Sequence, residues 1–408
     1  MARSSSHARV EALTGARAFA GVYILLLHFG RPLFAHAPRW AETLRHSGYV
    51  ATSFFLLLSG FVLTIAYGPK LADGRMSARE FLVARVARVY PCFVLAIALL
   101  VPLALVHSWG SVTAAFGDAS WKAKIATGMA HATMTHVFIP RFITSWNLPD
   151  WCVSVEMWFY LALPPLVAWL VARPRARTLV AVAAGAWLVA IVLASAYAIL
   201  SPDGVHADVE STAFWLSVLK FTPYTRWPEF VAGAALGALW LRTPAERRDT
   251  RFATPLVAGG ALACAAILLC GRTIPYVLLH NGALLPLYAA IVWGLMLGRG
   301  PLHRALSLRP LTALGDSSYV LYILQVPLLQ WMVLVTGNRY DALGARFTAI
   351  ALPLILAIAV AVHHLAERRA QAWLRPQLAR LTTPLAGYFA GSSITSMRNP
   401  PAASSTRS

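Results

Sequence analysis

The sequence predicts an all-α polytopic membrane protein with about ten transmembrane helices and no soluble domain. Hydrophobic residues make up 58% of the 408 residues and charged residues only 12%, whereas about a quarter of a typical soluble domain is charged. The mean hydropathy is +0.61, and the apolar residues lie in long blocks rather than in alternation. A block of about 20 apolar residues crosses the hydrocarbon core of a bilayer, and a helix satisfies its own backbone groups there.

Ten blocks have the length and composition of a spanning helix. They lie, in chain order, at residues 13–33, 48–68, 85–107, 150–171, 179–200, 213–241, 252–271, 277–298, 312–336 and 346–366. The segment from Trp121 to Phe138 is an alternative further crossing. Counting it would place every later basic loop on the opposite side of the membrane. We therefore expect 108–149 to be an outer loop that contains an amphipathic or re-entrant helix.

Basic residues are concentrated in alternate connections between the blocks. The connections after the second, fourth, sixth and eighth blocks and both flanks of the chain are rich in Arg, whereas the loop 201–212 contains neither Lys nor Arg. Because basic loops stay in the cytoplasm, we expect a multi-pass protein of the plasma (bacterial inner) membrane with both termini cytoplasmic. This distribution accounts for the formal net charge of +19 without a nucleic-acid partner.

The blocks belong to one membrane domain, which we place at residues 11–375. Residues 1–10 and 376–408 are rich in polar and small residues, and we expect them to be largely disordered cytoplasmic ends. The first block is full length and contains Arg17, so we interpret it as an anchor rather than a cleaved signal peptide. The four cysteines form no CxxC pair. We therefore expect neither a disulfide framework nor a zinc site, and no metal.

The first block carries two polar residues, Arg17 and His28, within otherwise apolar sequence. Eleven residues correspond to three helical turns plus about 20°, so both side chains share a face, about 16 Å apart along the axis. A charge inside a membrane is costly and indicates a functional site. The alternative is that Arg17 reaches the headgroups and His28 is a hydrogen-bonded core residue.

The third block begins with a second pair of cations, Arg85 and Arg88, followed by Tyr90. Three residues apart on a helix, the two arginines lie on one face. Guanidinium groups bind phosphate through several donors at once. The alternative is an ordinary basic flank at the cytoplasmic boundary.

Carboxylates occur inside two other blocks. Glu156 lies about two turns into the fourth block, at a depth similar to that of His28, so we expect the two to meet in the bundle interior. In the sixth block, Arg226 and Glu229 are three residues apart. They can pair with each other, and a kink at Pro228 would open a cavity beside them.

Seven stretches together resemble the membrane-bound acyltransferase-3 family, which O-acylates surface polysaccharides and other acceptors. Arg17 and His28 are similar to its R-x10-H pattern. The other six stretches are FFLLLSGFVL, ARVARVYP, WNLPDWCVSVEMWFYLALPPL, RWPEFVAGAALG, LGDSSYVLYILQVPLL and LAERRAQAWL. Three features depart from the family pattern. Gln325 replaces a frequent His, so we expect no acid–base role there; Arg369 replaces a Pro; and the insert LPDWCV interrupts the usual compact WSLSVE.

The resemblance implies an O-acyltransferase with acyl-CoA as co-substrate, acetyl being the group most typical of the family, and with no bound cofactor. It implies that His28 is the general base or a transient acyl carrier, and that Glu156 assists it. Arg17, Arg85, Arg88 and Tyr90 would bind acyl-CoA. The acceptor would be a hydroxyl of a glycan or a lipid-linked glycan. Further residues that we expect beside the acceptor or the pore are Ser59, Trp146, Ser154, Arg226, Glu229 and Tyr322.

A proton-coupled transporter or lipid-linked sugar flippase is the alternative function, since it also needs intramembrane Arg, His and Glu. Such carriers are commonly built from repeated halves with broken helices at corresponding positions. The sequence contains proline-broken segments but no matching halves. An inert structural membrane protein is a third alternative, although it would not need the intramembrane charges.

Overall fold

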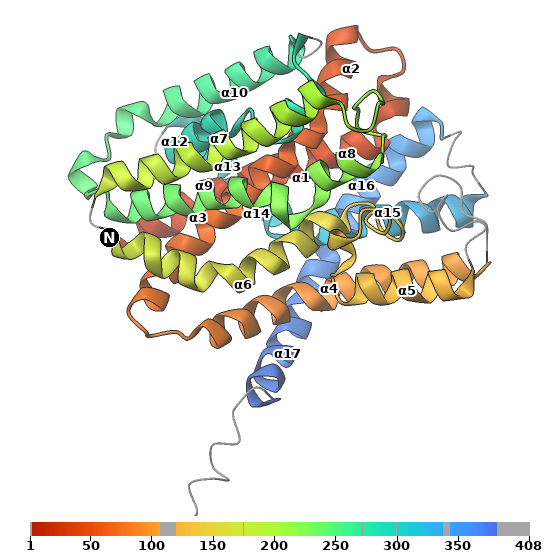
Figure 1. Ribbon diagram of the computed structural model, residues 1–408, viewed down its shortest axis with the longest axis horizontal. Coiled ribbons are helices and arrows are strands. Elements are labelled where there is room, and N and C mark those ends of the chain that lie inside the picture. The colour runs from red at the N-terminus through yellow and green to blue at the C-terminus, as the bar shows by residue number, and fades with distance from the viewer. Residues whose placement is uncertain are drawn as a thin grey trace, which may run out of the picture.

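A computed structural model describes residues 2–106, 120–173, 175–270, 273–298, 300–337 and 343–381 (Figure 1). Within these residues the fold contains helices and no strand. The long helices are α1 (Ala2–Phe29), α3 (Ala51–Ala72), α4 (Ala78–Val106), α6 (Asp150–Ala172), α7 (Ala176–Leu200), α9 (Pro223–Arg242), α10 (Ala253–Leu269), α12 (Leu285–Leu297), α15 (Ser318–Thr336) and α16 (Ala345–Val362). The shorter ones are α2 (Arg39–His46), α5 (Trp121–Ala132), α8 (Phe214–Phe221), α11 (Tyr276–His280), α13 (Pro301–Leu306), α14 (Arg309–Asp316) and α17 (Arg368–Leu381).

The multi-pass membrane architecture predicted from the sequence is confirmed. In the part of the chain that the structure describes, nine helical stretches are long and apolar enough to cross a membrane. The sixth predicted block is not among them. It divides into α8 and α9 at Thr222, because Pro223 starts a new helix, the position where proline is best tolerated. At twenty residues α9 is still long enough to cross, although Arg226 and Glu229 make it less apolar.

The direction of neighbouring helices supports α9 as a tenth crossing. On α15 and α4, Tyr319 donates to the Val89 carbonyl and Trp331 to the Leu99 carbonyl, so these helices run parallel. On α3 and α9, Ser53 donates to Glu229, and Gly237 packs against Phe61 further along both helices. These two helices also run parallel. This agrees with α3 and α9 as the second and sixth of ten alternating crossings.

Residues 120–149, the described part of the segment between α4 and α6, contain no helix long enough to cross the membrane. With twelve residues, α5 is only about 18 Å long. Phe81 near the start of α4 contacts Tyr160 of α6, with ring centroids 6.2 Å apart. Arg85, further along α4, lies near Glu156, which is earlier on α6. Therefore α4 and α6 are antiparallel, and the connection between them begins and ends on one side of the bundle, as the sequence analysis expected.

Several predicted boundaries differ from the observed ones. The first helix starts at Ala2, within the end expected to be disordered, and finishes at Phe29 rather than near residue 33. A nucleated helix extends by one hydrogen bond per residue, which favours continuation into residues 2–10. At the other end, α17 continues to Leu381, past the expected boundary at 375, and residues 382–408 lie outside the described part.

The centre of the bundle depends on the close approach of α3 and α9. A Cβ placed on Gly233 would lie 1.9 Å from the Leu57 carbonyl oxygen, and one on Gly60 would lie 2.1 Å from the Phe230 carbonyl oxygen. Such small residues allow helix backbones to touch. The GxxxG spacing of Gly233 and Gly237 therefore serves packing, and it holds α3 in place beside the site described below.

Replacing Gly233 by alanine is expected to destabilise the protein by about 3 kcal/mol, because the backbones of α3 and α9 must separate. Gly259→Ala on α10 is the matched control, since nothing lies within 4 Å of the Cβ it would add. We expect this control to be neutral or to stabilise by up to about 1 kcal/mol. The measurement is the free energy of unfolding in mixed micelles, and equal values for both variants would contradict the packing argument.

Candidate functional site

A cavity of about 280 Å³ lies between α1, α3, α4, α6 and α15. It extends along α3 from Phe55 to Tyr67, about 18 Å for twelve residues of helix. Tyr67 and Arg85 mark one end, and Phe55 and Tyr322 mark the other. The sequence-predicted residues that line it are Arg17, Ser59, Arg85, Arg88, Glu156 and Tyr322. Five separate helices thus bring together six of the predicted site residues.

Three arginines give this cavity a positive charge. Arg85 donates to the Tyr67 hydroxyl at 2.7 Å, and its guanidinium carbon lies 5.0 Å from the centre of that ring. Arg88 follows one turn later on α4 and lines the same cavity, as does Arg17 from α1. Glu156 is the single carboxylate in the lining. Three cations against one anion favour an anionic ligand.

Glu156 belongs to the arginine part of the cavity. Its carboxylate accepts a hydrogen bond from Tyr160 at 2.8 Å, and the Ser59 hydroxyl is within hydrogen-bonding reach. Cys152 and Tyr160, four residues before and after Glu156, line the same wall. Helical spacing could have identified both from the sequence.

The expected meeting of Glu156 with His28 is wrong. Because α1 ends at Phe29, His28 lies in its last turn, whereas Glu156 lies six residues, about 9 Å, beyond the start of α6. The depth estimate failed because it assumed a longer first helix. His28 instead contacts Gln325 of α15, with 3.3 Å between Nδ1 and Oε1.

Gln325 fixes the hydrogen-bonding state of His28. The Gln325 amide nitrogen donates to the Tyr322 carbonyl at 3.0 Å, so Oε1 is the atom directed toward His28. An amide oxygen only accepts, and Nδ1 of His28 therefore carries the hydrogen while Nε2 keeps a free lone pair. Tyr322 is the last cavity residue on α15, and the His28–Gln325 pair follows one turn later.

Three other predicted site residues do not line this cavity. Tyr90 lies two residues after Arg88, about 200° around the helix, and its hydroxyl donates to the Ala132 carbonyl at the end of α5. Ser154 likewise lies two residues from Glu156 and is fully buried. Trp146 donates to the Thr127 hydroxyl at 3.2 Å and packs with Leu100 and Leu103.

Arg226 and Glu229 form the predicted pair, and neither side chain lines the cavity described above. Their side chains are 2.8 Å apart and fully buried. Arg226 also donates to the His280 carbonyl at 2.7 Å, and Ser53 donates to Glu229 at 3.0 Å. This network joins α3, α9 and α11, so we assign both residues to the packing of the bundle.

Glu229→Leu is expected to destabilise the protein by about 3–5 kcal/mol, because Arg226 is left as a buried charge without its carboxylate. The double variant Arg226→Met/Glu229→Leu should recover more than half of that loss. Unfolding in mixed micelles measures both. A single variant as stable as the native protein would show that the pair contributes nothing.

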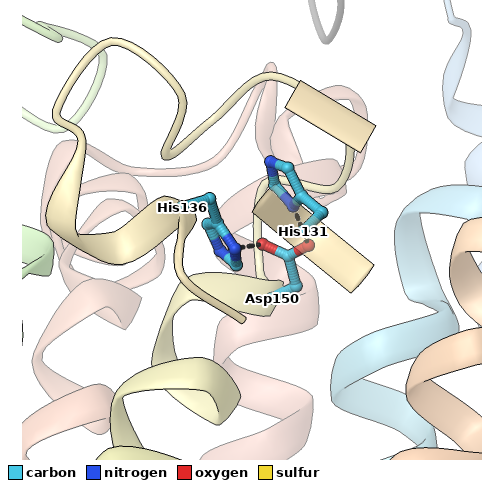
Figure 2. Close-up of side chains that lie close together, drawn as sticks. All are labelled: His131, His136 and Asp150. Atoms are coloured by element: carbon cyan, nitrogen blue, oxygen red, sulfur yellow. Dashed lines mark hydrogen bonds and ion pairs between the residues drawn. The ribbon is translucent and has the colours of Figure 1, made fainter. Parts of the chain in front are cut away.

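A second polar cluster, which the sequence analysis did not detect, lies at the start of α6. Asp150 contacts His131 at the end of α5 and His136 in the 3₁₀ turn His136–Phe138 (Figure 2). All three side chains are fully buried. Burial lowers the pKa of His136 below its usual value. The three residues come from the end of one helix, a 3₁₀ turn and the start of the next helix, so no single helical period brings them together in the sequence.

Comparison with known proteins places the chain in a family. A family profile described as "Acyltransferase domain" matches residues 10–364. The chain is 28% identical to "Acyltransferase MdmB" of Streptomyces mycarofaciens over 365 residues, 87% of this chain and 88% of the relative. It is 24% identical to "Putative peptidoglycan O-acetyltransferase YrhL" of Bacillus subtilis over 80% of this chain, but spans only half the length of that relative.

"Protein 2 in picA locus" of Rhizobium radiobacter is 42% identical over 88 residues, which are 22% of this chain and 42% of that relative. No solved structure matches the chain significantly. The family profile covers most of the chain, including every residue of the cavity. The chain therefore belongs to the acyltransferase-3 family and is a membrane acyltransferase.

Proposed function

We propose that the protein transfers an acyl group, acetyl in the first instance, from acyl-CoA to a hydroxyl of a glycan or lipid-linked glycan. The observation that carries the proposal is the single cavity in which Arg17, Arg85 and Arg88 meet and which ends one helical turn from His28 and Gln325. As a member of an enzyme family, the chain fits catalysis better than the alternative of a proton-coupled transporter or flippase.

The arginine part of the cavity would bind the phosphates of acyl-CoA. Guanidinium groups donate several hydrogen bonds to phosphate oxygens in a fixed geometry. In this proposal Glu156 positions the guanidinium groups, since Arg17 and Arg85 both interact with it electrostatically. The pantetheine arm would extend along α3 and carry the thioester toward Tyr322.

The direction of this arrangement fits a cytoplasmic donor. The Tyr67–Arg85 end lies near the end of α3 and the start of α4. The basic residues Lys70, Arg75 and Arg79 lie in the last turn of α3, in the short connection and in the first turn of α4. Basic connections are cytoplasmic by the positive-inside rule. Acyl-CoA would thus enter from the cytoplasm, and the acceptor would approach His28 from the opposite side.

His28 would act as the general base at the outer end. Its free Nε2 lone pair takes the proton of the acceptor hydroxyl as the acceptor oxygen attacks the thioester carbonyl. The carbon–sulfur bond then breaks, CoA leaves as a thiolate, and the imidazolium returns the proton to it. The alternative is that Nε2 attacks the thioester first and carries the acyl group to the acceptor.

Gln325→Leu is expected to lower kcat by about 10- to 100-fold with little change in KM, because His28 loses the acceptor that holds its Nδ1–H. Gln325→Glu keeps an acceptor and should retain activity, with the pH profile of kcat moved upward because a carboxylate favours imidazolium. Kinetics over pH measure both. An unchanged profile in Gln325→Glu would show that the contact is only structural.

The experiment that tests the proposed function uses the purified protein in nanodiscs with radiolabelled acetyl-CoA and a lipid and glycan extract of the host. Label transferred to the extract by the native protein, and absent with His28→Ala, supports O-acyl transfer from acyl-CoA. Failure of acetyl-CoA, longer acyl-CoAs and CoA itself to bind the folded protein would overturn the assignment of the donor.

A further inference from the structure

The last turn of α1 carries His28 and is held by a side chain from α2. Nη1 of Arg45 donates to the Leu26 carbonyl at 2.9 Å and to the Leu27 carbonyl at 2.8 Å. The last four carbonyls of a helix have no amide partner within it, and α1 ends at Phe29, so Arg45 supplies donors where the helix lacks them. We propose that Arg45 is a positioning residue for the acyl transfer, which fixes His28 by capping the helix that carries it.

The guanidinium group of Arg45 is itself fixed by an ion pair. Its Nε and Nη2 donate to the two carboxylate oxygens of Glu42, each at 2.7 Å. This is the bidentate arrangement that orients a guanidinium group in one plane. The Arg45 side chain is only 4% exposed, so its bonds to the two carbonyls of α1 are shielded from water and electrostatically stronger than surface contacts. Arg45 is therefore a rigid part of the helix end and not a mobile surface cation.

Two further contacts fix the backbone on either side of Arg45 against the end of α1. The Tyr23 hydroxyl donates to the Leu44 carbonyl at 2.5 Å. In the 3₁₀ turn Ser47–Val50, a Cβ placed on Gly48 would lie 2.6 Å from the Tyr23 carbonyl oxygen. Only glycine allows the turn to approach the helix so closely. Arg45 thus lies between two points at which the chain is attached to the final turns of α1.

His28 is consequently held from two directions. Arg45 binds the carbonyl of Leu27, the residue before His28, and Gln325 of α15 lies 3.3 Å from Nδ1 of the ring. If the last turn of α1 loosened, the ring would leave Gln325 and Nε2 would turn away from the acceptor hydroxyl. A displacement of about 1 Å at a reacting group lowers a rate by up to about 10²-fold. The inference rests on the proposed role of His28 as base, and it assigns Arg45 no contact with either substrate.

The test compares Arg45→Met with the native protein in nanodiscs, using radiolabelled acetyl-CoA and the lipid and glycan extract. Methionine keeps an unbranched apolar chain but has no donor. We expect kcat to fall about 10- to 100-fold, with KM for the extract and Kd for acetyl-CoA within about twofold. Arg45→Lys keeps a cation without the planar fork, and its kcat should lie between those of the other two. Arg39→Met removes an exposed arginine from the first turn of α2 and is the matched control, with native kcat expected.

A double-mutant cycle separates positioning from a contribution to folding alone. If Arg45 acts through His28, Arg45→Met should change the residual rate of His28→Ala by less than about twofold. Equal fold-changes in the native and His28→Ala backgrounds would assign the cap to folding alone. Hydrogen exchange gives an independent measurement, because without the cap the amides at the end of α1 should exchange faster while those of α3 and α9 do not change.

Three results would overturn the positioning role of Arg45: native kcat in Arg45→Met, a raised KM for the extract, which would place Arg45 in the acceptor site, or unchanged exchange at the end of α1. The failure of the proposed function is a different result. In that case the native protein transfers no label at all. Label transfer that is lost in His28→Ala but normal in Arg45→Met would reject only the positioning role.

Discussion

Replacing His28 by alanine is expected to lower kcat for acyl transfer by about 10²- to 10⁴-fold while leaving the Kd for acyl-CoA within about twofold. The reason is spatial. His28 lies beyond Tyr322, outside the lining of the cavity, so its loss removes the base but none of the groups proposed to hold the phosphates. Initial rates of label transfer and equilibrium binding of acetyl-CoA measure the two effects separately.

The matched control is His36→Ala, which removes an exposed imidazole a few residues after α1 and should leave both quantities unchanged. Native turnover by His28→Ala would exclude His28 as base and as acyl carrier. A loss of acyl-CoA binding comparable to the loss of rate would instead place His28 in the donor site.

The double substitution Arg85→Ala/Arg88→Ala is expected to raise the Kd for acyl-CoA by about 10²- to 10⁴-fold. Each hydrogen bond to a charged group contributes about 1.5–3 kcal/mol, and about 1.4 kcal/mol corresponds to a factor of ten. Isothermal titration with CoA and acetyl-CoA measures the change. Both ligands should be affected equally, because the arginines would contact the phosphates and not the acyl group.

Two controls separate specific contacts from net charge. Arg75→Ala removes a cation from the exposed turn before α4 and should change the Kd less than about threefold, since exposed charges are screened by salt. Arg85→Lys keeps the charge but loses the planar fork of donors, and we expect intermediate affinity. If Arg75→Ala and the double variant lost equal affinity for acyl-CoA, the effect of Arg85 and Arg88 on binding would be long-range electrostatic attraction and not direct contact.

Much of the fold and part of the site were predictable from the sequence. The apolar blocks predicted the crossing helices, and the distribution of basic loops indicated that 121–138 does not cross, with which the antiparallel α4 and α6 agree. Arg17, Arg85, Arg88 and Glu156 were recognisable because charges in apolar blocks are costly and therefore rare. These residues meet in one cavity because the polar faces of their helices are directed toward the same interior of the bundle.

Features that depend on where helices end and how their faces turn were not predictable. The early end of α1 at Phe29 separates His28 from Glu156, and the residues alone did not reveal it. Tyr90 was included with Arg88 although a two-residue step turns it to the opposite face. Gln325 departs from the family pattern, so the sequence predicts no acid–base role for it, and only the structure shows its contact with His28.

The most direct test of the central claim is a cryo-EM map of the protein in a nanodisc with a non-hydrolysable thioether analogue of acetyl-CoA, using a bound antibody fragment for alignment. The account predicts phosphate density against Arg17, Arg85 and Arg88, the pantetheine arm along α3, and the acyl end beside Tyr322 on the side of His28. Density for the analogue outside this cavity, or phosphates at the Tyr322 end, would contradict it.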